Sequence, residues 1–144
     1  VLDSYGKLND INLNILNQNI SKTIIFTSKN CDNKTIDLWN KLNIQFHIIN
    51  TNSNNKLQLN EMIDILGNMG ILQLLVEGGS EIYSNFIINK WFNEIIIYQS
   101  PILIGKNGID FFNMILSTNI NDKINLKLIN TYKIGLCTKN IYTI

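Results

Sequence analysis

Hydrophobic and polar positions follow two different periods along the chain, and this predicts strands that alternate with helices. Short β-branched or continuous apolar runs are typical of buried strands, whereas apolar residues three and four apart mark one face of a helix. On these grounds we expect strands at residues 23–27, 44–49, 71–76 and 94–98. Helices are expected from the N-cap Asp32 to Leu42, across residues 59–66 up to a stop at Gly70, and from Ser80 to Lys90.

The end of the chain changes from this alternation to paired strands. Residues 124–144 contain two strand-like runs joined near Gly135, which predicts a hairpin. The whole pattern predicts an α/β fold with three layers, in which a mostly parallel sheet carries an antiparallel C-terminal hairpin. The chain has 144 residues, enough to bury a core, and no linker interrupts it, so we expect a single domain.

Composition narrows the classes of partner. The formal net charge is +1, and all twelve basic residues are lysines that are spread along the chain. We therefore expect no electrostatic attraction that would favour binding to nucleic acid or to an anionic membrane. No apolar stretch is long enough to span a membrane, and the first residues do not resemble a signal peptide. Cys31 and Cys137 lie too far apart to indicate a disulfide framework or a zinc site, so we expect reduced thiols in a cytoplasmic protein.

The segment Val76-Glu77-Gly78-Gly79-Ser80 carries the clearest chemical signal, because it joins a predicted strand to a predicted helix. Ligands of α/β sheets bind at the carboxyl ends of strands, and glycines there let a ligand approach the backbone. The N–H groups that begin the next helix suit a diphosphate, and Ser80 could cap that helix or donate to a phosphate oxygen. The carboxylate of Glu77 could accept hydrogen bonds from sugar hydroxyls. Spacing alone fits a packing turn equally well.

Two other features favour structural roles. His47 is the only histidine, and it lies in an apolar strand-like run away from the glycine pair, which favours a structural or surface histidine. The segment Gly105-Lys106-Asn107-Gly108 lacks the spacing and the hydroxyl residue of a phosphate-binding Walker loop, so we interpret it as a turn. No pattern of metal ligands is present in the sequence.

Several segments together resemble one enzyme family. Leu75-Val76-Glu77-Gly78-Gly79 is followed by a predicted helix and then by the runs at residues 92–98 and 101–105, at the spacing of that family. The opening segment 1–8 and the predicted strand 23–27 match in the same order. From end to end, the chain resembles the reductase domain of the bifunctional riboflavin-biosynthesis deaminase/reductase.

The resemblance implies a dihydrofolate reductase-like fold and an enzyme that takes hydride from NADPH. The implied small-molecule substrate is 5-amino-6-(5-phosphoribosylamino)uracil, whose ribose is reduced to a ribityl chain. By position, Glu77 matches the glutamate that contacts the substrate, and Ser4 matches a cofactor contact. The stretch that wraps the NADP diphosphate matches Gly79, Ser80, Glu81, Ile82, Tyr83, Ser84 and Asn85. No catalytic acid or base is assigned, because the cofactor supplies the hydride chemistry.

The chain also departs from the family pattern. The family's reductase domain continues upstream of the position of Val1, and its zinc-binding deaminase domain has no counterpart here. We therefore expect the C-terminal portion of a reductase domain, acting as a homo-oligomer or with a chain that supplies the missing portion. Two alternatives stay open: reduction of the related diaminopyrimidinone ribosyl phosphate, and a half-domain that pairs with a partner and binds no substrate alone.

Overall fold

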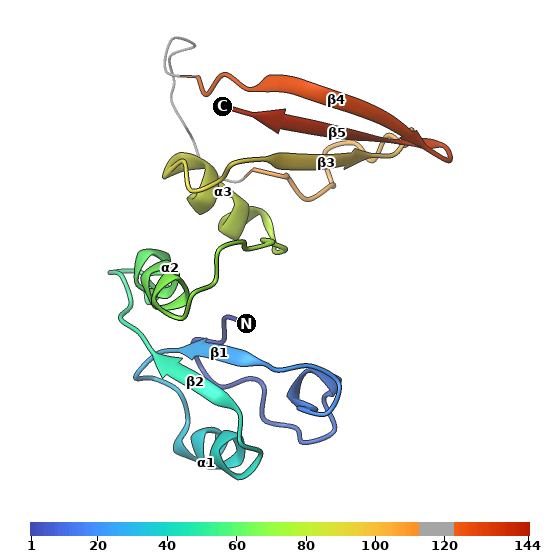
Figure 1. Ribbon diagram of the computed structural model, residues 1–144. Helices are drawn as coiled ribbons and strands as arrows, with labels where there is room; N and C mark the ends of the chain where they lie inside the picture. Colours follow the sequence, from blue (N-terminus) through green and yellow to red (C-terminus); the bar gives the residue numbers. More distant parts are fainter. Residues whose placement is uncertain (113–122) are drawn as a thin grey trace. The chain divides into compact units, whose positions relative to one another are not determined.

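The computed structural model describes residues 1–112 and 123–144, which fall into two units, Val1–Leu74 and Leu75–Ile144 (Figure 1). Each unit has its own sheet. The elements of the first unit are a 3-10 helix η1 (Asn14–Leu16), β1 (Ile24–Thr27), α1 (Asn33–Lys41), β2 (Gln45–Ile48) and α2 (Leu59–Asn68). Those of the second are α3 (Ser80–Ile88), β3 (Ile95–Gln99), β4 (Lys127–Ile134) and β5 (Cys137–Thr143).

The first unit is built on parallel strands around one small core. β1 and β2 pair in parallel, and Leu2 forms an isolated parallel bridge with Phe26 along the other edge of β1. Ile25 of β1 and Trp39 of α1 have no exposed surface, and they form one apolar cluster with Leu16 and Ile44. The strand supplies β-branched residues and the helix supplies its apolar face, which is why α1 covers this sheet.

The end of α2 follows the stop that the sequence predicts. Gly70 adopts a φ of +79°, in the left-handed region that glycine occupies without a steric penalty. The N–H of Ile71 donates to the carbonyl of Leu66 at 3.1 Å, and the N–H of Gly70 donates to the carbonyl of Gly67 at 2.9 Å. These bonds satisfy carbonyls that the end of a helix leaves free, so the helix ends here.

The second unit consists of α3 and an antiparallel sheet with the strand order β3-β5-β4. β4 and β5 form a hairpin in which Ile134 pairs with Cys137, and Gly135 occupies the turn with a φ of +61°. A glycine at positive φ is what a two-residue hairpin connection requires. On α3, Phe86 and Ile87 are buried.

The α/β class, the parallel sheet and the antiparallel C-terminal hairpin are confirmed. The strand predicted at residues 94–98 is present as β3, but it joins the antiparallel sheet and leaves Ile96 and Tyr98 exposed, so the prediction that it is buried was wrong. His47 lies in β2 and stacks on the ring of Phe26, with ring centroids 5.5 Å apart, in keeping with a structural histidine. That the chain forms one domain stays a prediction.

The predicted strand at residues 71–76 is wrong. The structure assigns no strand there, and the side chain of Leu72 is 99% exposed. The segment contains the boundary between the two units and pairs with neither sheet. An apolar run fits a buried strand only where neighbouring strands complete its backbone hydrogen bonds. No described residue outside the segment supplies that ladder.

No helix within residues 1–112 and 123–144 combines the length and the apolar character that a membrane span requires. The two cysteines in this part of the chain are free thiols, Cys31 buried and Cys137 partly exposed.

The two thiols are expected to differ in reactivity. Burial raises the pKa of the Cys31 thiol, and the charges of Asp3 and Asp32 raise it further against the opposing effect of a hydrogen bond with Thr27. Because the thiolate is the nucleophile, Cys31 should react with a disulfide reagent at pH 8 about tenfold or more slowly than Cys137. Stopped-flow measurement on the wild type and on Cys137→Ser assigns the two phases. Equal rates in the folded protein would contradict the prediction, and equal rates in urea are the control.

Candidate functional site

The segment after Leu75 leads directly into α3 and leaves the start of that helix without a side-chain cap. Gly79 is the N-cap residue, with an extended backbone (φ −88°, ψ 178°), and it makes no side-chain hydrogen bond. Its carbonyl accepts the N–H of Tyr83 at 3.2 Å, the first bond of the helix. Ser80 is the first helical residue and not the cap, so the suggestion that Ser80 caps α3 is corrected. The backbone N–H groups of the first turn therefore have no capping acceptor from this position.

The two glycines of the motif have different surroundings. A Cβ atom on Gly78 would lie 3.0 Å from Cβ of Ile82, and the N–H of Gly78 donates to the hydroxyl of Tyr83 at 3.1 Å. A Cβ atom on Gly79 would meet no other atom within 4 Å. A side chain on Gly78 would thus crowd Ile82 of α3, whereas the space next to Gly79 is open. That open space at a helix N-terminus fits a diphosphate group, which needs close approach to backbone N–H groups.

The seven residues matched to the diphosphate stretch do not all face the start of the helix. Ser84 is fully buried, and its hydroxyl donates to the carbonyl of Ser80 at 2.6 Å. The amide of Asn85 donates to the carbonyl of Glu81 at 2.9 Å. Both bonds run back to the carbonyl four residues earlier, so these two side chains bond within α3, one turn away from the N-cap.

Two aromatic rings support the loop before α3. The ring of Tyr83 stacks on that of Phe111, with centroids 5.3 Å apart, while its hydroxyl accepts the N–H of Gly78. Ile82 is half-buried behind Gly78. The residues at the solvent-facing start of α3 are therefore Gly79, Ser80 and Glu81, and Ile82 and Tyr83 hold the preceding loop in place.

Glu77 lies in the loop before α3 and is exposed. Within the described part of the chain, its carboxylate makes no hydrogen bond and no ion pair. Nor do three or more His, Cys, Asp or Glu side chains gather at a possible metal site among residues 1–112 and 123–144.

Ser4 lies in the first unit, whereas Glu77 and the α3 residues lie in the second. It occupies a turn directly after the residues that pair with β1. The carbonyl of Ser4 accepts the hydroxyl of Ser28 at 2.6 Å. Sequence reasoning missed Ser28 and also Asp3, whose buried carboxylate accepts backbone N–H groups of this turn. The available signal was an aspartate three residues before Gly6, a common turn pattern.

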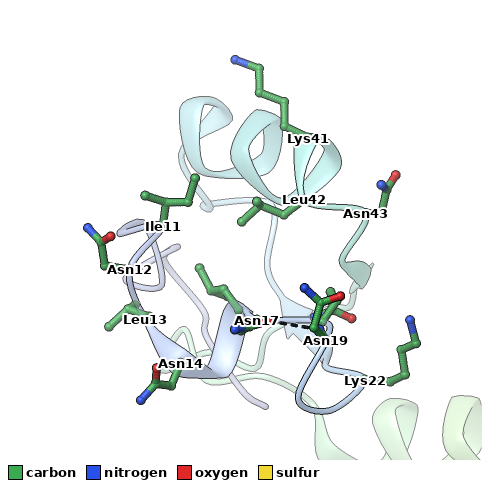
Figure 2. Close-up of a pocket in the computed structure, with 12 residues that line it drawn as sticks. Ile11, Asn12, Leu13, Asn14, Asn17, Asn19, Lys22, Lys41, Leu42 and Asn43 are labelled. Carbon is green, nitrogen blue, oxygen red and sulfur yellow. Dashed lines mark hydrogen bonds between the residues drawn. The ribbon is translucent and has the colours of Figure 1, made fainter.

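A hollow of about 610 Å³ lies at another place on the first unit, lined by the loop at residues 11–22 and by the end of α1 (Figure 2). Asparagine side chains, Lys22 and Lys41 surround it. None of the predicted site residues lines this hollow.

Comparison with known proteins agrees with the resemblance. Residues 1–138 match the family model of the RibD C-terminal domain. The riboflavin biosynthesis protein RibD of Bacillus amyloliquefaciens is 32% identical over 92 residues, which cover 64% of this chain and 24% of that protein. The chain therefore spans about a quarter of the length of this relative.

Solved structures show the same fold at low identity. RibD of Acinetobacter baumannii superposes with a TM-score of 0.77 at 19% identity, over 99% of this chain and 36% of that one. A deaminase/5-amino-6-(5-phosphoribosylamino)uracil reductase of Thermotoga maritima gives a TM-score of 0.73 at 17% identity, with the same coverage. Because the family model matches nearly the whole sequence, the chain belongs to the RibD C-terminal domain family.

Proposed function

We propose that this chain carries the reductase step of riboflavin biosynthesis, in which NADPH reduces the ribose of 5-amino-6-(5-phosphoribosylamino)uracil to a ribityl chain. The observation that carries the proposal is the open space at Gly79, where α3 begins without a side-chain cap. Family membership and the reductase activity for which the Thermotoga maritima relative is named support the same reaction. The protein would act in the cytoplasm, as a homo-oligomer or with a chain that supplies the upstream part of the reductase domain.

Each group of this chain has a limited task in the proposed reaction. The N–H groups at the start of α3 and the hydroxyl of Ser80 would hold the cofactor diphosphate, since both donate hydrogen bonds to phosphate oxygens. The exposed carboxylate of Glu77 would orient the sugar by accepting hydrogen bonds from its hydroxyls. The bound cofactor supplies the hydride, so the protein's contribution is position and charge.

The test measures NADPH binding and NADPH oxidation separately. Binding is followed by the fluorescence of the reduced nicotinamide, and turnover by the loss of its absorbance with the ribosylaminouracil phosphate or with the diaminopyrimidinone analogue. Both assays use the 144-residue chain alone and with a separately produced upstream reductase segment, because the chain spans 24% of a curated relative. We expect binding in both samples and faster reduction of the uracil substrate when the segment is present.

Three outcomes would change the proposal. Preferential turnover of the diaminopyrimidinone would replace the substrate. Absence of NADPH binding in both samples would reject the reductase and favour the non-catalytic half-domain. Full activity of the chain alone would show that no upstream segment is needed.

A further inference from the structure

The segment Gly105-Lys106-Asn107-Gly108, which the sequence predicts to be a turn, forms one in the second unit. The N–H of Gly108 donates to the carbonyl of Gly105 at 3.1 Å, and a bond between residues three apart is the one that closes a β-turn. Gly105 adopts a φ of +76°, and Asn107 occupies the third position of the turn. The proposed reduction uses none of these four residues.

Asn107 precedes a glycine, and this is the arrangement in which an asparagine reacts most readily with its own backbone. The backbone nitrogen of Gly108 can attack the side-chain carbonyl carbon of Asn107, which closes a five-membered ring. Glycine has no Cβ atom, so it neither shields the attacking nitrogen nor restricts the φ and ψ angles that ring closure requires. In the whole sequence, Asn107 is the one asparagine that a glycine follows.

The surroundings of Asn107 leave this reaction open. The side chain is exposed, and its carboxamide makes no hydrogen bond with any residue that the structure describes. Residues 100–112 belong to no helix or strand, so the backbone can change its φ and ψ angles without breaking either. The bond from Gly108 to Gly105 holds the attacking N–H and opposes the reaction. It is a single bond in an exposed loop, however, where local opening costs little free energy.

Asn52 provides a contrast within the same chain. It precedes Ser53, which is also small, so the sequence alone would mark Asn52 as a second reactive position. In the structure, the carboxamide oxygen of Asn52 accepts the N–H of Asn54 at 2.9 Å and the N–H of Lys56 at 3.0 Å. These bonds hold the carboxamide in a turn of its own, and both must break before it can reorient for ring closure.

We propose that Asn107 is a site of spontaneous deamidation through a succinimide. The Gly108 nitrogen forms a bond to the Asn107 carbonyl carbon, the carbon–nitrogen bond of the carboxamide breaks, and ammonia leaves with the proton of the Gly108 amide. Water then opens the ring at either carbonyl and yields aspartate or isoaspartate. One water is consumed, one ammonia is released, and no atom is oxidised or reduced. Each event lowers the formal net charge of +1 by one unit. The inference is independent of the proposed function.

The test follows the charge of the purified chain during incubation at mildly alkaline pH, where more of the attacking amide is deprotonated. Isoelectric focusing should show a growing acidic band. Peptide mapping by mass spectrometry should find aspartate and isoaspartate at position 107, while Asn52 stays intact. Asn107→Gln should abolish the acidic band, because the longer side chain would have to close a larger and less favourable ring. In urea, which removes the turn around Asn52, that residue should begin to convert as well.

Three results would overturn the inference. If position 107 stays intact in the folded chain and converts only in urea, the turn protects Asn107. If Asn52 converts as fast as Asn107 in the folded chain, the hydrogen bonds of the two carboxamides do not decide which one reacts. An acidic band that persists in Asn107→Gln would place the change of charge elsewhere in the chain.

Discussion

Replacing Gly79 with valine is expected to weaken NADPH binding about 10- to 100-fold, the cost of losing one or more charge-assisted hydrogen bonds to the diphosphate. The new side chain would fill the open space at the start of α3, where no protein atom lies within 4 Å of a Cβ atom. The φ of −88° at Gly79 is ordinary for any residue, so the backbone is not strained. The poorer N-cap should cost about 1 kcal/mol of helix stability, which leaves the fold intact.

A matched control is available on α2. A Cβ atom on Gly67 would likewise meet no other atom within 4 Å, and Gly67 has no positive φ and lies in the other unit. Gly67→Val should therefore change neither the circular dichroism spectrum nor the NADPH affinity. Fluorescence titration of both variants gives the comparison. Undiminished affinity in Gly79→Val would remove the start of α3 as the diphosphate site.

Glu77→Gln is expected to lower kcat/KM by about 10- to 100-fold, corresponding to roughly 1.5–3 kcal/mol for a charge-assisted hydrogen bond that acts in the transition state. The affinity for NADPH should change much less, since the carboxylate is assigned to the sugar and not to the diphosphate. Because Glu77 is exposed and holds no described residue, the substitution should leave the melting temperature unchanged.

The control for Glu77 is another exposed carboxylate, Asp64 on α2. Asp64→Asn removes the same charge from the chain at a different place, so it reports the effect of net charge alone. Steady-state rates with the ribosylaminouracil phosphate and the upstream segment give kcat/KM for both variants. If Glu77→Gln and Asp64→Asn behave alike, Glu77 has no part in the reaction.

Local sequence signals correctly predicted most of the elements whose formation depends on residues close in sequence. The periodic apolar face of α2 and the stop at Gly70 depend on neighbours within a turn or two, and both are confirmed. The hairpin at Gly135 depends on a short turn and is also confirmed. The segment at residues 71–76 and the pairing of β3 depend on which distant strands lie beside them, and hydrophobic periodicity does not contain that information.

The same distinction between local and distant contacts applies to the candidate site. The glycine pair and the start of α3 follow from residues next to each other, but the different roles of Gly78 and Gly79 come from the side chain of Ile82 one turn further on. The contact between Ser4 and Ser28 joins residues 24 positions apart, so no local motif indicates it. The roles of Glu77 and of the cofactor contacts stay predictions that the variants above test.

The two tryptophans give each unit its own spectroscopic reporter. Trp39 lies in the first unit with no exposed surface, whereas Trp91 lies in the second, 37% exposed and edge-on to Phe86. The fluorescence of a buried indole has its maximum at a shorter wavelength than that of an indole in contact with water. The emission of Trp39 can therefore be distinguished from that of Trp91. Melting of the parallel-stranded unit and melting of the antiparallel one can thus be followed separately in a single unlabelled sample, which decides whether the units unfold as one cooperative body or as two.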